Sequence, residues 1–193
     1  MVLLTGYRKI KTAVFISGTG SNLKSLINFS KTKKSPISIN LIISNNSKAK
    51  GLNYAKLNKI KKKVLNFKNK NLTENNLLNI LKKNHIEMIC LAGFMKILSN
   101  NFIKKFKGKI LNIHPSLLPK YKGLNTYKRA LNNKEKYSGC TVHFVNSKLD
   151  SGEIILRKRV KISKNETEAS LAKKILAQEH KLYPKAIIKI FNL

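Results

Sequence analysis

The chain has 193 residues, a length that suits one domain with a substantial core, and its 42% hydrophobic content includes no apolar run long enough to cross a membrane. Its formal net charge is +32 at pH 7, but only 4 of its 40 basic residues are Arg, and Lys, Asn and Ile are abundant, so the charge indicates compositional drift more than a nucleic-acid-binding surface. The two cysteines, Cys90 and Cys140, are too few for a disulfide framework and lack metal-ligand spacing, so we expect a cytoplasmic protein with two buried thiols.

The first half of the chain alternates short apolar runs with helical patterns. This alternation predicts strands over 12–17, 37–44, 63–67 and 86–94, separated by helices over 21–31, 48–59 and 73–84. Thr73 is a suitable N-cap for the last of these helices. Residues 1–11 have only a short apolar stretch, and we expect an N-terminal extension there and not a signal peptide.

The second half continues the same alternation. It predicts a helix over 99–106, a strand over 109–114, a helix near 124–133, strands over 137–146 and 153–162, and a final helix over 166–190. The last two strands are joined by a short loop, which favours an antiparallel hairpin. We therefore expect a single α/β domain over 12–193 with a mostly parallel sheet and helices on both faces. Ligands of such sheets bind at the carboxyl ends of the strands, which places 18–22, 93–96 and 112–114 on one rim.

The stretch "SGTGSNL", residues 17–23, lies between the first strand and the first helix. Backbone N–H groups of a glycine-rich turn and of a helix N-terminus suit a phosphate group. A dinucleotide is disfavoured, because Leu23 occupies the place of the third glycine and Asn45 and Asn46 stand where a ribose-binding acid is expected. The loop therefore predicts a phosphomonoester site, with a plain tight turn as the alternative.

The stretch "LNIHPSLLPKY", residues 111–121, places Asn112 and His114 two apart at a strand end, so their side chains point to the same side. An amide N–H₂ and an imidazole N–H can together stabilise a developing oxyanion. Pro115 and Pro119 stiffen the loop that follows. The alternative is a polar pair that is satisfied within a turn.

Asp150, the only Asp in the chain, lies in the loop of the predicted hairpin. If Asp150 meets His114, it would raise the pKa of the imidazole and favour the charged form, whereas a plain turn residue is the alternative. His143 alternates with apolar neighbours and is more typical of a structural residue than a catalytic one. No His, Cys and acidic residues have metal-ligand spacing, so we expect no metal.

The order "ISGTGSNL … SNNSKAKGL … LAGFMKILS … LNIHPSLLPKYKGLNTYKRAL … GCTVHFVNSKLDSGEII … QEHKLYP" resembles the phosphoribosylglycinamide formyltransferase family. The resemblance spans about residues 12–190. It implies a single-domain, Rossmann-like formyltransferase fold, with a phosphate-binding N-terminal half and a folate-binding C-terminal half. It also implies transfer of the formyl group of 10-formyltetrahydrofolate to the amine of glycinamide ribonucleotide in purine biosynthesis, by a monomer or a homodimer.

The resemblance also implies a role for individual residues. Those that hold the substrate are Gly20, Ser21 and Asn22 at its phosphate and Glu179 at its ribose and glycinamide end. Those that catalyse are Asn112 and His114, which stabilise the tetrahedral intermediate, and Asp150, which keeps His114 charged. Those that bind the folate are Met95, Lys96, Ile97 and Leu98, together with the loop of Asn146, Ser147, Lys148, Leu149 and Asp150, which closes over the pterin.

Two positions depart from the family pattern, and a third correspondence has two candidates. Lys96 stands where the family often has Arg, and Asn125 stands where it often has His. Either Lys68 or Lys70 corresponds to a basic folate-binding residue of relatives. The alternatives are another folate-dependent formyltransferase, acting on methionyl-tRNA or a nucleotide sugar, a formyltetrahydrofolate hydrolase, and a basic RNA-binding module. We expect neither the second C-terminal domain of the tRNA enzymes nor the N-terminal regulatory domain of the hydrolases.

Overall fold

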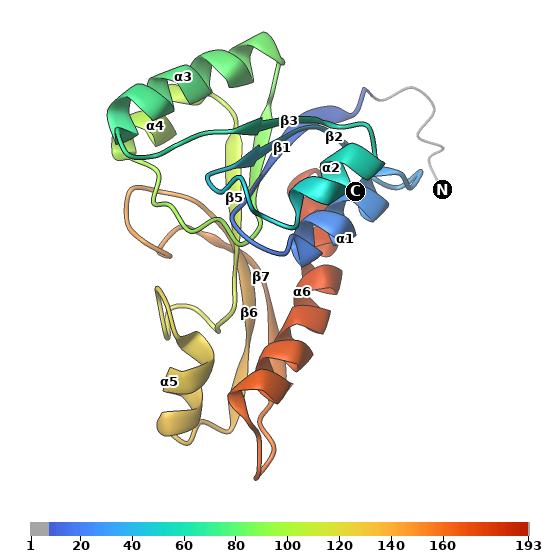
Figure 1. Ribbon diagram of the computed structural model, residues 1–193. Helices are drawn as coiled ribbons and strands as arrows, with labels where there is room; N and C mark the ends of the chain where they lie inside the picture. Colours follow the sequence, from blue (N-terminus) through green and yellow to red (C-terminus); the bar gives the residue numbers. More distant parts are fainter. Residues whose placement is uncertain (1–7, 193) are drawn as a thin grey trace.

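The fold is a seven-stranded sheet with helices against both faces (Figure 1). The structure is a computed structural model, and it describes residues 8–192. The strands are β1 Ile10–Ile16, β2 Ile37–Ser44, β3 Lys61–Val64, β4 Met88–Leu91, β5 Lys109–His114, β6 Tyr137–Phe144 and β7 Ile154–Lys161. The helices are α1 Ser21–Ser30, α2 Leu52–Leu57, α3 Lys70–Lys83, α4 Asn100–Lys105, α5 Thr126–Asn132 and α6 Glu168–Ile190. None of these helices is long and apolar enough to cross a membrane.

The strand order is β3-β2-β1-β4-β5-β6-β7, and the first five strands in this order run parallel. The predicted hairpin of β6 and β7 is confirmed, and β6 also pairs antiparallel with β5. The strand that carries Asn112 and His114 is therefore the boundary between the parallel and antiparallel parts of the sheet. The predicted mostly parallel α/β fold is confirmed, with a larger antiparallel part than the hairpin alone.

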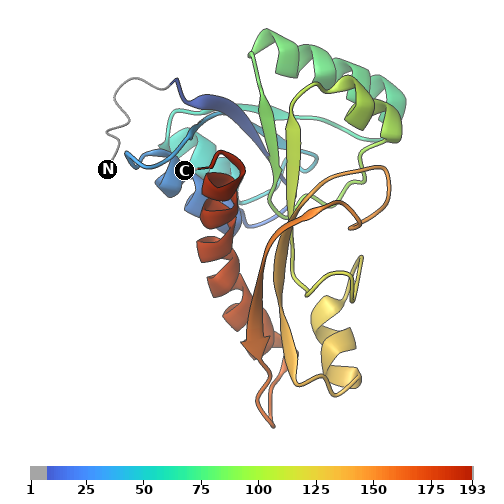
Figure 2. The same cartoon turned by 180° about the vertical axis from the view of Figure 1, so that it is seen from behind.

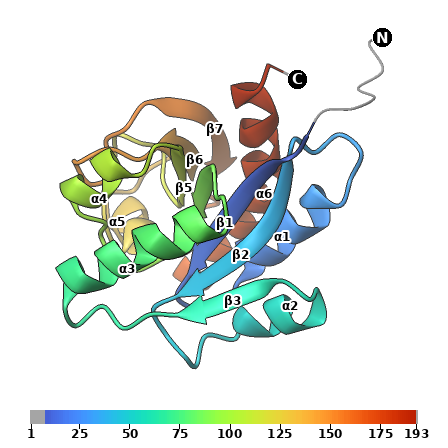
Figure 3. The same cartoon turned by 90° about the horizontal axis from the view of Figure 1, so that it is seen from above.

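Two apolar cores separate the sheet from its helices, because successive side chains of a strand point to opposite faces. On β1, Val14 and Ile16 belong to the core beneath α1, α2 and α6, whereas Ala13 and Phe15 belong to the core beneath α3 and α4. Figures 2 and 3 show the long helix α6 beside α1 on one face and the pair α3 and α4 on the other. The prediction of helices on both faces is confirmed.

Two helix predictions were wrong at their ends. The helix predicted over 48–59 is restricted to Leu52–Leu57. It begins late because Gly51 packs against the loop between β1 and α1, where the Gly51 N–H donates to the Gly18 carbonyl at 3.0 Å. The helix predicted over 73–84 begins at Lys70. Its N-cap is Asn69, whose side chain accepts from the Leu72 N–H, whereas the Thr73 hydroxyl lies inside the helix and donates to the Asn69 carbonyl.

Two strand boundaries differ from the predicted ones, and one of these differences affects the site. The strand predicted over 86–94 ends at Leu91, because the chain turns away at Gly93, which has a φ of 73°. Residues 92–98 therefore lie outside the strand and line a cavity beside the sheet. At the other end, β1 begins at Ile10, inside the expected extension 1–11, and residues 1–7 lie outside the described part of the chain.

Candidate active site

The loop between β1 and α1 leaves the N-terminus of α1 open. Gly20 is the N-cap residue, with a φ of 77°, and no side chain among residues 8–192 caps the first turn. A Cβ at Gly20 would lie 2.6 Å from the Cα of Gly51, so only glycine allows the two backbones to approach this closely. Free N–H groups at a helix N-terminus attract anions, so this loop has the geometry expected of a phosphate site.

Asn22 and Glu179 join this loop to α6. The Asn22 Nδ2 donates to the Glu179 Oε2 at 2.7 Å, and both side chains are buried. Burial raises the pKa of Glu179 to about 7, although the hydrogen bond from Asn22 opposes the rise. The Asn22 Oδ1 is buried and has no hydrogen-bond partner among residues 8–192, and buried acceptors of this kind call for a donor. This pair therefore presents acceptors beside the open helix end.

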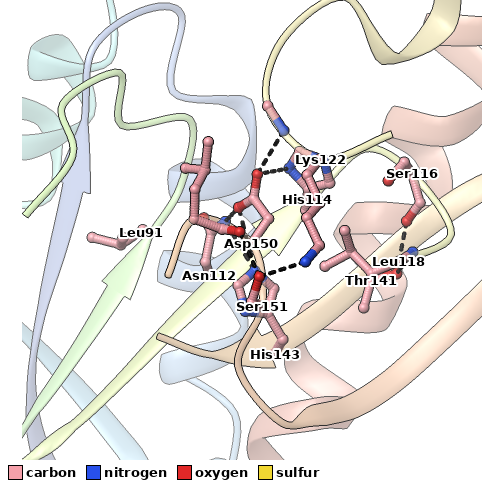
Figure 4. A network of polar contacts seen from close by, with 12 residues as sticks. Leu91, Asn112, His114, Ser116, Leu118, Lys122, Thr141, His143, Asp150 and Ser151 are labelled. Carbon is pink, nitrogen blue, oxygen red and sulfur yellow. Dashed lines mark hydrogen bonds and ion pairs between the residues drawn. The ribbon is translucent and has the colours of Figure 1, made fainter. Parts of the chain in front are cut away.

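The second group of polar side chains comes from β5 and from the loop after β6 (Figure 4). Asp150 reaches His114 with its Oδ2 3.4 Å from Nδ1, and its Oδ1 lies 3.4 Å from the Asn112 Nδ2. Asp150 adopts a φ of 45°, a left-handed conformation that Asp tolerates better than most residues. The predicted meeting of Asp150 with His114 thus occurs, and Asn112 belongs to the same cluster.

The pKa of His114 is lowered, whereas the sequence predicted that Asp150 would raise it. Burial lowers the pKa of His114, and the Tyr121 carbonyl and Asp150 only partly oppose this effect. Burial raises the pKa of Asp150, but His143, the Gly123 N–H and His114 outweigh it, so the pKa of Asp150 is below its ordinary value. Asp150 does act on His114 in the predicted direction, but the desolvation of the imidazole is the larger effect.

The loop after β5 fixes the ring of His114. The His114 Nε2 lies 2.9 Å from the Tyr121 carbonyl, and because a carbonyl can only accept, Nε2 carries the hydrogen. The Gly123 N–H donates to the Asp150 Oδ2 at 2.9 Å, and the Lys122 Nζ donates to the Ser151 Oγ at 2.5 Å. These two bonds hold the β5–α5 loop against the β6–β7 loop directly beside the cluster.

A cavity of about 650 Å³ connects the open end of α1 with this cluster. Every site residue that the sequence predicted lines it: Gly20, Ser21, Asn22, Met95, Lys96, Ile97, Leu98, Asn112, His114, Asn146, Ser147, Lys148, Leu149, Asp150 and Glu179. Asn125 lines it as well, whereas Lys68 and Lys70 are not among its lining residues. Four side chains leave large apolar groups exposed around it: Met95, Ile97, Leu124 and Leu149.

Several groups that contact the Asn112, His114 and Asp150 cluster were not indicated by the sequence. His143 stands opposite Asn112 on β6; its Nδ1 lies 2.7 Å from the Phe144 carbonyl, and its Nε2 lies 3.2 Å from the Asn112 Nδ2 and 3.7 Å from the Asp150 Oδ1. The period-two pattern of β6 placed His143 on a face without showing that this face meets β5. Tyr121 takes part through its backbone carbonyl, for which a sequence carries no signal. Among residues 8–192, no group of three His, Cys, Asp or Glu could hold a metal ion.

An α/β sheet with Asn, His and Asp side chains clustered at the end of its last parallel strand, and with an open helix N-terminus lining the same cavity, is typical of an enzyme with a site suited to chemistry at a carbonyl carbon. A family model described as formyl transferase matches residues 10–187. The chain belongs to this formyl transferase family and, within it, to the phosphoribosylglycinamide formyltransferases. The predicted resemblance is confirmed.

The relatives support this assignment along nearly the whole chain. The phosphoribosylglycinamide formyltransferase of Haemophilus influenzae is 42% identical over 185 residues, which cover 94% of this chain and 87% of that protein. The crystal structure of the Brucella melitensis protein of that name superimposes with a TM-score of 0.90 at 39% identity and covers 95% of this chain and 96% of its own. The trifunctional purine biosynthetic protein of Homo sapiens is 42% identical over 183 residues, but the chain spans only 18% of its length.

Proposed function

We propose that this chain transfers the formyl group of 10-formyltetrahydrofolate to the amine of glycinamide ribonucleotide, a step of purine biosynthesis. The observation that carries the proposal is the single cavity that runs from the open end of α1, past Asn112, His114 and Asp150, to an exposed apolar rim. Such a cavity offers a place for a phosphate, a place for reaction and a place for a flat apolar ring system, in that order. The names of the relatives supply the acceptor, phosphoribosylglycinamide, and the formyl transferase family implies the folate donor.

The ribonucleotide is expected at the α1 end of the cavity. Its phosphate would accept hydrogen bonds from the backbone N–H groups that follow Gly20, at Ser21 and Asn22, because these have no side-chain acceptor in the first turn. The Asn22 Oδ1 and the Glu179 carboxyl group are acceptors, so they suit the ribose hydroxyls and the glycinamide N–H groups better than the phosphate. Glu179 thereby fixes the end of the substrate that carries the amine.

The folate is expected at the other end, against the residues released from β4. The pterin and benzoyl rings would cover the exposed side chains of Met95, Ile97 and Leu149, and binding would bury this apolar surface. Lys96 and Lys148 also line the cavity and can attract the carboxylates of the folate, although Lys lacks the forked geometry of Arg. The loop 146–150 would close over the pterin.

The reaction joins the two substrates without a covalent link to the protein. The amine nitrogen attacks the formyl carbon, the carbonyl oxygen becomes an oxyanion, the amine loses a proton, and N10 of the folate leaves with one. The N–H₂ of Asn112 and a ring N–H of His114 would stabilise the oxyanion. In the structure these donors face Asp150, His143 and the Tyr121 carbonyl, so they must exchange these partners for the oxyanion.

The low pKa of His114 fits this sequence of events. Burial keeps the ring neutral until a negative oxygen develops beside it, and that oxygen, together with Asp150, then raises the pKa of the ring. His114 would take up the proton that the attacking amine loses, carry the charge while the intermediate exists, and return the proton as N10 leaves. Asp150 supports the imidazolium through its carboxylate 3.4 Å from Nδ1.

The test is a turnover assay with 10-formyltetrahydrofolate, run with and without glycinamide ribonucleotide. Deformylation that requires the ribonucleotide supports the transferase, deformylation without it identifies a hydrolase, and no folate turnover overturns the proposal. Asp150→Asn and His114→Asn should each lower turnover by about a hundred-fold or more with a smaller effect on substrate affinity. His85→Asn is the matched control, because His85 is exposed beyond α3 in a left-handed conformation that Asn accepts.

A further inference from the structure

A second cavity, of about 480 Å³, lies beside the segment that carries Tyr121 and shares no lining residue with the candidate active site. It is bounded by the 117–121 segment, the turn between α5 and β6, and Arg159 of β7. In Figure 1 this region lies beside α5, where β6 begins. Its walls hold four basic side chains and one carboxylate: Lys120, Lys134, Lys136, Arg159 and Glu135.

Arg159 is unusual among the four arginines of the chain. The other three each bond a carboxylate or a backbone carbonyl: Arg8 with Glu87, Arg129 with Lys122, and Arg157 with Leu118. The guanidinium of Arg159 instead lies over the ring of Tyr137, 4.1 Å from its centroid, and makes no hydrogen bond or ion pair within residues 8–192. In a chain that otherwise uses lysine almost throughout, the forked donor set of this arginine is free and lines a cavity.

The other charges leave the cavity positive. The carboxylate of Glu135 is already bound by the Lys120 Nζ and by the Tyr121 hydroxyl, both at 2.7 Å. The side-chain ammonium groups of Lys134 and Lys136 have no hydrogen-bond or ion-pair partner in the described part of the chain, and the two residues stand on either side of Glu135 in the sequence. Arg159, Lys134 and Lys136 thus line one cavity, and none of the three is paired with a carboxylate of the described residues.

We propose that this cavity binds a phosphate-bearing anion, a phosphate ester or a polyphosphate, through Arg159, Lys134 and Lys136. Arginine and lysine donors around a hollow bind several oxygens of one phosphate group, which a single surface lysine does not. The site shares no lining residue with the substrate cavity, so it takes a second ligand and not the substrate.

Tyr121 connects the two cavities. Its side chain lines the second cavity and donates to Glu135, whereas its carbonyl accepts from the Nε2 of His114 at 2.9 Å. An anion in the cavity attracts Lys120 away from Glu135, which leaves the Tyr121 hydroxyl as the remaining side-chain donor to that carboxylate and strengthens its hydrogen bond. We expect the bound anion to alter turnover through the position of His114. This coupling rests on the proposed function, whereas the binding does not.

Binding is tested by NMR with pyrophosphate as the probe, at constant ionic strength set with sodium chloride. With only four arginines, the side-chain Nε–H signals are few, and that of Arg159 should shift saturably while that of Arg8 stays in place. Arg159→Ala should weaken binding, read at the Tyr121 and Lys134 amides, by about ten-fold or more. Lys158→Ala is the matched control: it removes the same charge from the next position of β7, whose side chain points to the opposite face. Equal, unsaturable shifts of all four arginine signals would overturn the proposal.

Two further arms complete the test. If ADP binds more tightly than pyrophosphate, the ligand is a nucleotide ester, and equal affinities indicate recognition of the phosphates alone; both outcomes support the site. Pyrophosphate at saturating substrates should change turnover in the wild type and in Lys158→Ala but not in Arg159→Ala. Binding without any change in turnover would overturn the coupling through Tyr121, and an inactive protein that still shows the Arg159 shift would count against the proposed function alone.

Discussion

The burial of Glu179 makes the stability of the fold depend on pH. Glu179 is 5% exposed, its carboxyl group accepts a hydrogen bond from Asn22, and burial raises its pKa from about 4.5 to about 7. The folded state therefore binds the proton more tightly than the unfolded chain. The stabilisation is fully present below the pKa of the unfolded chain and is lost as the pH rises through about 7.

The magnitude follows from the width of that interval. At about 1.4 kcal/mol for each pH unit, the rise from 4.5 to about 7 corresponds to a loss of about 3 kcal/mol in the free energy of unfolding on the alkaline side. Glu179→Gln keeps the shape and the acceptor for Asn22 but cannot ionise. We therefore expect the variant to match the wild type within about 1 kcal/mol near pH 5 and to exceed it by about 2 to 3 kcal/mol near pH 8.

Urea unfolding at a series of pH values, in the absence of ligands, measures this difference. Glu153→Gln is the control, because Glu153 is exposed and the same substitution there should leave the pH dependence of the wild type in place. Stability curves of Glu179→Gln and wild type that stay parallel across this range would refute the reasoning, since they would mean that the buried carboxyl group ionises without cost.

The remaining predictions concern the backbone and the loops around the site. Gly20→Ala should cost about 2 kcal/mol of stability or more, because it combines a left-handed φ with a contact 2.6 Å from the backbone of Gly51; unfolding with urea measures it, and a neutral effect would contradict the close approach. Lys122→Ala should lower turnover by about five-fold without changing stability, because it releases the 2.5 Å bond to Ser151 that joins the two loops; unchanged turnover would show that the loops need no such tie. Asn69→Ala should destabilise the protein by about 1 kcal/mol through loss of the α3 N-cap, measured by thermal unfolding, and an unchanged melting temperature would remove that role.

Much of the architecture was predictable because hydrophobic periodicity reports burial directly. The strand 109–114 was predicted with the bounds it has, since its apolar run ends in polar residues and a proline. Helix ends were less predictable, because several residues of the 66–73 stretch could cap α3 and only the tertiary packing selects Asn69.

The residues of the candidate site were predictable from the chemistry that their side chains are able to perform. Asn112, His114 and Asp150 were predicted, and the structure brings them together. The partners that tune them were not, because the Tyr121 carbonyl and the Gly123 N–H are backbone groups present at every position. The lowered pKa of His114 was not predictable either, since it depends on how deeply the ring is buried.

The two strands at the edges of the sheet also bear on how copies of this protein behave at high concentration. The edge strand β3 consists of Lys61, Lys62, Lys63 and Val64, all exposed, and the opposite edge strand β7 has four basic residues among its eight. An unpaired edge is a template for the addition of another chain, and closely spaced like charges oppose that addition. Both edges of this sheet therefore repel their counterparts on a second molecule, and the lysine-rich composition protects the fold against edge-to-edge aggregation until salt screens the charge.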